Sequence, residues 1–281
     1  MRPADVDAAT EALLRGDWGE RRAWFAFVAG HAGCHPVVAE DDGAIVGTGV
    51  GTTNGAVGWV GTIYVVPERR REGLGHALTQ RVCDGLEAAG CRTLVLVATD
   101  EGRRLYERMG FEVFDRYATL ERHATGTGAP EGSAAARVDG ARAMTAFTRA
   151  DVPEAAALDR AATGEDRAHL LAAFSEEPGG LALRGGADGR LRGFLCRAPW
   201  GGGATIAADP EDARVILAER LRAAERGHRV RAGVLASNEA GLAMLHRDGW
   251  TDAWTAPRLA RGAPIEAPLS GIWGQFNHAL G

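Results

Sequence analysis

The stretch from Val65 to Gly75, VVPERRREGLG, carries residue types that could do chemistry. A Val-x-Pro at a strand end is followed by three arginines and a Gly-x-Gly turn, and an amphipathic helical pattern begins at Leu74. A helix N-terminus exposes N–H groups that have no partner inside the helix, together with partial positive charge. Because glycine lacks the Cβ that would block a close approach, such a turn predicts an anion cradle.

The surrounding pattern predicts the elements that would position this turn. Apolar spacing of three and four residues predicts helices, and short alternating or β-branched runs predict strands. The predicted helices span 5–15, 20–31, 74–90 and 101–110, and the predicted strands span 36–40, 44–51, 57–66, 93–98 and 111–122. The first three strands should form an antiparallel meander, with 93–98 as a buried central strand.

The chain reads as two related halves joined by a linker that is rich in glycine, alanine and threonine. LYERMGFE at 105–112 matches MLHRDGWT at 244–251, and TIYVVPE at 62–68 matches TIAADPE at 205–211. The RRREGLG turn has no counterpart in the second half. We therefore expect two α/β (α+β) domains, 1–124 and 141–281, joined by a linker at 125–140, each with a mixed, mostly antiparallel sheet flanked by helices.

Composition excludes several classes of function. The 281 residues carry a net charge of -5, and all 32 basic residues are arginine, which argues against a general nucleic-acid surface. No apolar run is long enough to span a bilayer and the N-terminus does not read as a leader, so we expect a cytoplasmic protein. The cysteines lack metal-site spacing, so we expect packing thiols and no metal; they are Cys34, Cys83, Cys91 and Cys196.

The element order, with V-x-P-x-x-R-x-x-G-x-G and L-Y-E-R-x-G-F, resembles the GCN5-related N-acetyltransferase (GNAT) family, in a tandem two-domain form. The family's cofactor signature falls on Arg70, Gly73 and Gly75. The resemblance implies acetyl-coenzyme A as co-substrate, with its pyrophosphate at the turn. The residues expected around the pyrophosphate are Arg70, Arg71, Gly73, Leu74, Gly75, His76 and Ala77.

The resemblance also implies roles beyond the turn. The pantetheine arm would run along Ile63, Tyr64, Val65 and Val66, and the Val65 N–H would stabilise the oxyanion. Tyr106 stands where the family often keeps a general acid for the departing thiolate, although a packing role would also explain an aromatic residue there. Thr99 stands where many relatives have an asparagine that orients the arm.

The implied reaction is direct transfer of an acetyl group to a primary amine of a small molecule in a ternary complex. The second half keeps the asparagine, as Asn238, but has Leu245 at the tyrosine position, so we expect it to be degenerate. Two alternatives stay open: a mycothiol-synthase-like acyltransferase and a non-catalytic acyl-coenzyme A-binding regulatory module. The expected partner is the amine acceptor, without nucleic acid or membrane; a homodimer is left open.

Two further sets of residues can be explained by a structural role as well as by a functional one. Candidates for the general base are Glu20, His35, Glu40 and Asp115, each of which also reads as a solvated or loop residue. LDRAATGEDRAHLL, from Leu158, resembles the opening of the second domain in tandem relatives. Its Asp159, Gly164 and Arg167 fit a surface helix pair as well as a substrate role.

Overall fold

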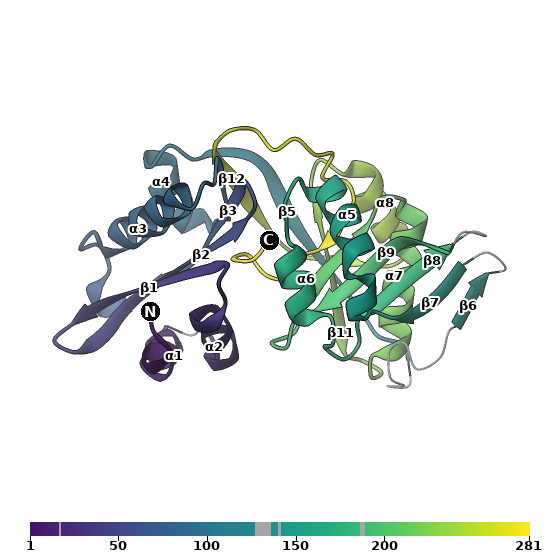
Figure 1. Ribbon diagram of the computed structural model, residues 1–281, viewed down its shortest axis with the longest axis horizontal. Helices are drawn as coiled ribbons and strands as arrows, with labels where there is room; N and C mark the ends of the chain where they lie inside the picture. The colour runs from purple at the N-terminus through teal and green to yellow at the C-terminus, as the bar shows by residue number, and fades with distance from the viewer. Residues whose placement is uncertain (17, 127–135, 140–141, 186–188) are drawn as a thin grey trace. The chain divides into compact units, whose positions relative to one another are not determined.

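Figure 1 shows the computed structural model of the chain, which describes residues 1–16, 18–126, 136–139, 142–185 and 189–281. The chain divides into two units that both draw on the two halves of the sequence. Unit 1 consists of Met1–Glu112, Leu259–Pro264 and His278–Gly281, and unit 2 consists of Val113–Arg258 and Ile265–Asn277.

Unit 1 contains the elements that the sequence predicts for 1–110. Its helices are α1 (Val6–Leu14), α2 (Arg22–Gly30), α3 (Leu74–Ala88) and α4 (Asp100–Arg108). Its strands are β1 (Cys34–Asp41), β2 (Ala44–Asn54), β3 (Val57–Val65), β4 (Thr93–Val97) and the end of β12 (Thr251–Gly262). β1, β2 and β3 form the predicted antiparallel meander, and β4 runs parallel to β3.

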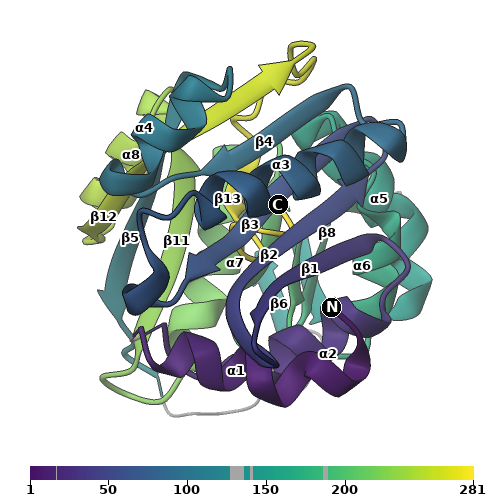
Figure 2. The same cartoon turned by 90° about the vertical axis from the view of Figure 1, so that its left-hand side faces the viewer.

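Glycines on one face of β2 allow α3 to lie close to the sheet. A Cβ at Gly47 would come within 2.8 Å of the Leu78 side chain, and one at Gly51 within 3.1 Å of Leu86 and Val82. Because side chains alternate across a strand, the other face of β2 is left for α1 and α2. Figure 2 shows α1 and α2 below these strands and α3 above them. The repeated glycine thus sets the distance between α3 and β2.

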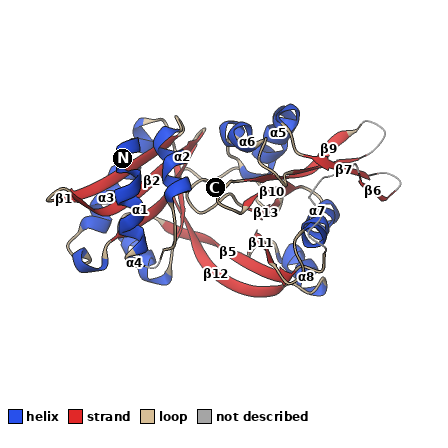
Figure 3. Cartoon of the chain, turned by 90° about the horizontal axis from the view of Figure 1, so that it is seen from below, coloured by secondary structure: helices blue, strands red, loops and turns tan. Residues whose placement is uncertain are grey.

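Unit 2 is built on a second, antiparallel sheet in the order β13-β10-β9-β8-β7-β6. These strands are β6 (Ala136–Asp139), β7 (Arg142–Ala146), β8 (Leu181–Gly185), β9 (Arg190–Arg197), β10 (Gly203–Ala207) and β13 (Ile272–Gly274). Its helices are α5 (Val152–Thr163), α6 (Ala168–Phe174), α7 (Pro210–Ala223) and α8 (Glu239–Arg247). Figure 3 shows α5 and α6 on one side of the strands and α7 on the other.

The last strand of each sequence half does not stay wholly with its own half. β5 (Glu112–His123) pairs in unit 2 with β11 (Arg229–Leu235), whereas the end of β12 joins unit 1 beside β4. There, Thr93 Oγ1 donates to the Ala263 carbonyl at 2.7 Å. Of the predicted linker, 127–135 and 140 lie outside the described residues, and Ala136–Asp139 form β6. The limits 1–124 and 141–281 stay a prediction.

Candidate active site

The turn between β3 and α3 takes an unusual backbone conformation. After Pro67 to Arg69, which form a single 3-10 turn, Arg71 has a φ of 66° and Gly73 has a φ of 87°. Left-handed backbone is rare for a residue with a side chain and clusters at binding and catalytic sites. Gly73 is the N-cap of α3. The turn therefore presents successive N–H groups at the start of a 15-residue helix.

Nothing in the described part of unit 1 fills this helix N-terminus. The first N–H of α3 with a partner in the helix is that of Ala77, which donates to the Gly73 carbonyl at 3.0 Å. Among the described residues no side chain caps Gly73. Leu74 and Gly75 are half-buried, and His76 and Ala77 are exposed. The N–H groups before Ala77 are therefore directed at a site that the described protein groups do not occupy.

Internal packing does not explain the glycine at position 75. A Cβ there would meet only Leu105, at an ordinary contact distance of 3.6 Å. Glycine within a helix costs about 1 kcal/mol relative to alanine. At position 73, in contrast, a Cβ would meet nothing within 4 Å, and the φ of 87° is what requires glycine. The missing side chain of Gly75 thus leaves room on the outside of the helix, where a ligand could approach the backbone.

The three arginines differ in their environments. Arg69 pairs with Asp41 and with Glu72, the latter at 2.8 Å, so its charge is largely balanced by carboxylates. Arg70 donates from Nε to the Val65 carbonyl at 3.2 Å, which ties the turn to the end of β3. Arg71 is exposed. Arg70 and Arg71 are the members of the cluster that suit an added anion.

Among the described residues, no strand pairs with one edge of β3 as it approaches the turn. It pairs with β4 only from Val57 to Trp59, and Thr62 then adopts a φ of 51° at a register shift opposite β2. A bulge of this kind bends a strand and re-aims its backbone groups. The Val66 N–H donates to the Val46 carbonyl of β2 at 2.9 Å. Since backbone groups alternate between edges, the Val65 N–H and carbonyl point away from β2.

Tyr106 lies on α4, where it packs on the core that also receives Ile63 of β3. Its ring makes an edge contact with Phe111 at 6.1 Å between centroids. Burial raises the pKa of Tyr106 to about 12, and the nearby Cys83 thiol adds to the shift. The hydroxyl is therefore a protonated group near neutral pH, as a general acid requires. Its ring also has a clear packing role.

Thr99 begins α4, because its hydroxyl accepts a hydrogen bond from the Gly102 N–H at 3.1 Å. In unit 2 Asn238 begins α8 in the same way, accepting from Gly241 at 2.9 Å, and its amide donates to the Ser270 carbonyl at 3.0 Å. The two helices therefore share a start motif, as the internal repeat predicts. At Thr99 the hydroxyl accepts in the cap and keeps its own hydrogen to donate, and the arm-orienting role stays a prediction.

The structure gives little support to the four candidates for the general base. His35, on β1, contacts Thr53 Oγ1 at 2.9 Å, and burial lowers its pKa. It stands two strands away from β3, about 10 Å at the usual strand spacing. Glu20 accepts from the Arg22 N–H, Glu40 is exposed near the end of β1, and Asp115 accepts from Ser237 in unit 2. The described hydrogen bonds of Glu20, His35 and Asp115 do not include Val65.

The four cysteines are free and buried. Burial raises the pKa of Cys34 and of Cys83 to about 11 and raises that of Cys91 and Cys196. They pack as small apolar side chains. Among the described residues, no group of three or more histidine, cysteine or acidic side chains is arranged to hold a metal, and no helix is long and apolar enough to cross a bilayer.

The counterpart helix in unit 2 has an N-terminus that its own acids occupy. Asp209 caps α7 by accepting from the Glu211 N–H at 2.9 Å, and Asp212 follows in the first turn, buried and paired with Arg192 and Arg142. Negative side chains at a helix N-terminus satisfy the dipole and repel further anions. The N-terminus of α7 is therefore occupied by acidic side chains, whereas no described side chain caps the N-terminus of α3.

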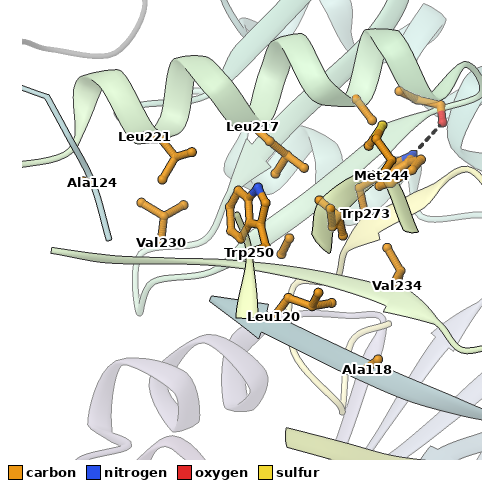
Figure 4. Close-up of a cluster of buried hydrophobic side chains, with 14 residues drawn as sticks. Ala118, Leu120, Ala124, Leu217, Leu221, Val230, Val234, Met244, Trp250 and Trp273 are labelled. Carbon is orange, nitrogen blue, oxygen red and sulfur yellow. Dashed lines mark hydrogen bonds between the residues drawn. The ribbon is translucent and has the colours of Figure 1, made fainter. Parts of the chain in front are cut away.

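β10 is the counterpart of β3, and its equivalent edge is covered. β13 pairs with β10 there, and the Ala207 N–H donates to the Gly271 carbonyl at 3.1 Å. The Ala207 carbonyl accepts from the Trp273 indole at 3.0 Å, the bond drawn in Figure 4. Trp273 is fully buried in the core cluster that α7 and β11 share. Comparing the two halves of the sequence does not reveal this covering of β10, because β13 and Trp273 lie in a segment outside the repeat.

Comparison with known proteins finds the same family in both halves of the chain. An acetyltransferase (GNAT) family model matches residues 4–111, and an acetyltransferase (GNAT) domain model matches residues 155–274. The chain belongs to the GNAT family of acetyltransferases. It is a tandem member, as its motifs predict, and the α/β fold class is confirmed.

Solved structures share the GNAT fold over the whole chain. A Pyrococcus horikoshii protein assigned as an acetyltransferase superposes with a TM-score of 0.78 at 20% identity, covering 100% of this chain and 94% of its own. A GCN5-related N-acetyltransferase from Sphaerobacter thermophilus gives 0.61 at 16%, covering 96% of each chain. A tandem GNAT protein of clavulanic acid biosynthesis gives 0.59 at 14%, covering 94% of this chain and 98% of its own.

A curated relative also matches part of the chain. Glucosamine 6-phosphate N-acetyltransferase from Trypanosoma brucei brucei is 32% identical over 66 residues, which are 24% of this chain. The match spans 45% of the length of that relative. The likeness thus supports an acetyltransferase.

Proposed function

We propose that this GNAT protein transfers an acetyl group from acetyl-coenzyme A to a primary amine of a small molecule, and that unit 1 alone performs the reaction. The observation that carries the proposal is the open end of α3 beside the open edge of β3. The pyrophosphate suits the N–H groups at Gly73 and Gly75, with Arg70 and Arg71 at the rim. The pantetheine arm suits the edge at Val65.

The residues around Val65 suit direct transfer. The uncharged amine attacks the thioester carbonyl carbon, so that an N–C bond forms and the C–S bond breaks. The Val65 N–H donates to the carbonyl oxygen as its negative charge develops. The departing thiolate takes the proton of the Tyr106 hydroxyl, the proton lost by nitrogen leaves to water, and Tyr106 is then reprotonated from solvent. No covalent enzyme intermediate is needed.

Unit 2, by the same criteria, lacks a cofactor site. Asp209 and its neighbouring acids close the start of α7, and Trp273 and β13 cover the edge of β10. We therefore propose a stoichiometry of one acetyl-coenzyme A for each chain.

A Gly75→Glu substitution tests the cofactor site. Its Cβ has room beside Leu105, and an acid in the first turn favours the helix, so the fold should be retained. The same carboxylate would occupy the proposed pyrophosphate position. Calorimetric titration of acetyl-coenzyme A should give one equivalent for the native chain and at least tenfold weaker binding for the variant, about 1.4 kcal/mol.

Gly85→Glu is the matched control, because it makes the same change on the same helix, where a Cβ meets nothing within 4 Å. Its binding should equal that of the native chain. Equal binding by both variants would remove the cofactor from α3, and binding of two equivalents would contradict the closed state of unit 2.

The acceptor screen should begin with amino sugars and their phosphates. The curated relative is named for glucosamine 6-phosphate, which gives a starting compound for this chain. Cysteinyl amino sugars belong in the same screen, because the mycothiol-synthase-like alternative requires them. Tight binding without turnover of any amine would favour the regulatory-module alternative.

A further inference from the structure

Arg261, near the end of β12, contacts three parts of unit 1 at once. Its Nη2 donates to Glu87 Oε1 in the last turn of α3 at 2.7 Å, and its Nη1 donates to the Met109 carbonyl at the end of α4 at 3.1 Å. Its Cζ lies 5.1 Å from the centre of the Phe111 ring. A cation suits this position, because the C-terminal end of a helix carries partial negative charge. One guanidinium thus joins the ends of α3 and α4.

The end of α4 that Arg261 contacts is bonded directly to Tyr106. The Tyr106 carbonyl accepts from the Met109 N–H at 2.9 Å and from the Phe111 N–H at 3.1 Å. The Tyr106 ring makes its edge contact with the same Phe111 ring that Arg261 covers. Arg261 therefore reaches Tyr106 through one intervening residue along two routes, Met109 and Phe111.

The second half of the sequence supplies Arg261, and contacts on both sides of it hold its strand in unit 1. The Ala263 N–H donates to the Arg92 carbonyl at 2.9 Å. Leu259 is fully buried in the core cluster on which Tyr106 packs. Arg261 lies between these two anchors and is itself half-buried. Its guanidinium is therefore carried by a segment that is fixed against unit 1.

Unit 2 contains the equivalent contact with the sequence halves exchanged. The internal repeat aligns Arg261 with Arg122 of β5, and Met109 with Asp248. Arg122 Nη1 donates to the Asp248 carbonyl at the end of α8. At the position of the tyrosine, α8 has Leu245. The last strand of each half thus supplies an arginine to the helix of the other half, and of these two helices only α4 has a hydroxyl at that position.

We propose that Arg261 is a positioning residue that holds Tyr106 where its hydroxyl can protonate the departing thiolate. The inference rests on the proposed function, in which Tyr106 is the general acid. The last carbonyl groups of a helix have no partner within it, and Arg261 supplies one for Met109. A general acid has to lie within hydrogen-bond reach of the atom it protonates, so a shift of about 1 Å in this turn of α4 would slow the transfer.

A double-mutant cycle in the full chain tests the proposal. Arg261→Met keeps an apolar stem and removes the guanidinium, and it is made in the native chain and in Tyr106→Phe. The measured rate is the release of the coenzyme A thiol from bound acetyl-coenzyme A, with water as acceptor and again with glucosamine 6-phosphate. We expect a fall of roughly tenfold in the native chain and of less than about twofold in Tyr106→Phe, because the two residues act through one group. The Kd of acetyl-coenzyme A should stay within about twofold.

Arg122→Met is the matched control, because it removes the equivalent contact from α8, which has no tyrosine. Urea unfolding should show a similar loss of stability for Arg122→Met and Arg261→Met, whereas only Arg261→Met should lower the rate. Arg261→Lys is a milder variant, since lysine keeps the charge beside Glu87 but lacks the planar guanidinium. Its rate should fall less, with the same dependence on Tyr106, and it carries the cycle if Arg261→Met does not fold.

Two results would overturn the inference. One is an equal fall in rate in the native and Tyr106→Phe chains, which would mean that Arg261 acts elsewhere. The other is an equal fall in Arg122→Met and Arg261→Met, which would leave Arg261 with a structural role alone. An unchanged rate in Tyr106→Phe by itself would instead remove the general acid from the proposed function, and this inference with it.

Discussion

The Trp273 indole donates its hydrogen bond to the Ala207 carbonyl at 3.0 Å, on the strand that corresponds to β3. In unit 1 the matching region is an open edge at Val65, where the carbonyl accepts only the Arg70 side chain in the described contacts. The two units thus use one strand in two ways. The edge of β10 is completed by the chain itself, and the edge of β3 is the one for which we propose a ligand.

Trp273→Phe should destabilise unit 2 without creating a second cofactor site. The substitution leaves the buried Ala207 carbonyl without its donor, which costs about 1–3 kcal/mol. The acids at the start of α7 remain, so the stoichiometry of acetyl-coenzyme A should stay at one. Urea unfolding measures the cost, and Trp254→Phe, at a 38% exposed residue, serves as the control. Equal unfolding midpoints for the two variants would contradict the role of Trp273.

Tyr106→Phe should lower kcat roughly 10²-fold or more while the Kd of acetyl-coenzyme A changes little. Phenylalanine keeps the ring contact with Phe111 and removes only the hydroxyl that we propose as the acid for the thiolate. Single-turnover rates beside calorimetry separate the two quantities. An unchanged rate would leave Tyr106 with its packing role alone.

Alkaline pH should destabilise the fold through buried tyrosines. Burial raises the pKa of Tyr106 and of Tyr117 to about 12, from an ordinary value of 10.0. Between these values the unfolded chain loses its phenolic protons while the folded chain keeps them, so the free energy of unfolding falls as pH rises. Urea titrations from pH 9 to pH 12 should show this fall, and Tyr106→Phe should make it shallower. A slope that Tyr106→Phe leaves unchanged would exclude its contribution.

The Asp159–Arg167 pair should be a structural element of unit 2. Both side chains are buried, and Arg167 Nε donates to Asp159 Oδ2 at 2.9 Å. Arg167→Leu leaves a buried carboxylate without its partner, at a cost of about 3–5 kcal/mol, while adding Asp159→Leu should recover part of this loss. Thermal unfolding of the single and double variants measures both effects. A double variant that is less stable than Arg167→Leu would contradict this account.

Local signals account for most of what the sequence could predict. The Gly-x-Gly turn and the spacing of Leu74, Leu78, Val82 and Leu86 locate α3 and its open start, since helix periodicity and backbone conformation depend on neighbours in the chain. Thr99 and Asn238 mark the start of α4 and α8 for the same reason. The family motif on Arg70, Gly73 and Gly75 likewise needs only short-range order.

Contacts between segments far apart in the sequence decided which strand edges and faces are covered. Residues 259–264 join β4, residues 278–281 pack on Gly61, and Trp273 covers β10, although no local pattern marks these segments. A strand edge or a glycine face can be matched by any extended segment of suitable shape, so its partner is selected by the packing of the whole chain. The sequence by itself determined the turn, the helices of residues 1–110 and the family; only the tertiary structure decided which strand edge stays open and which is covered.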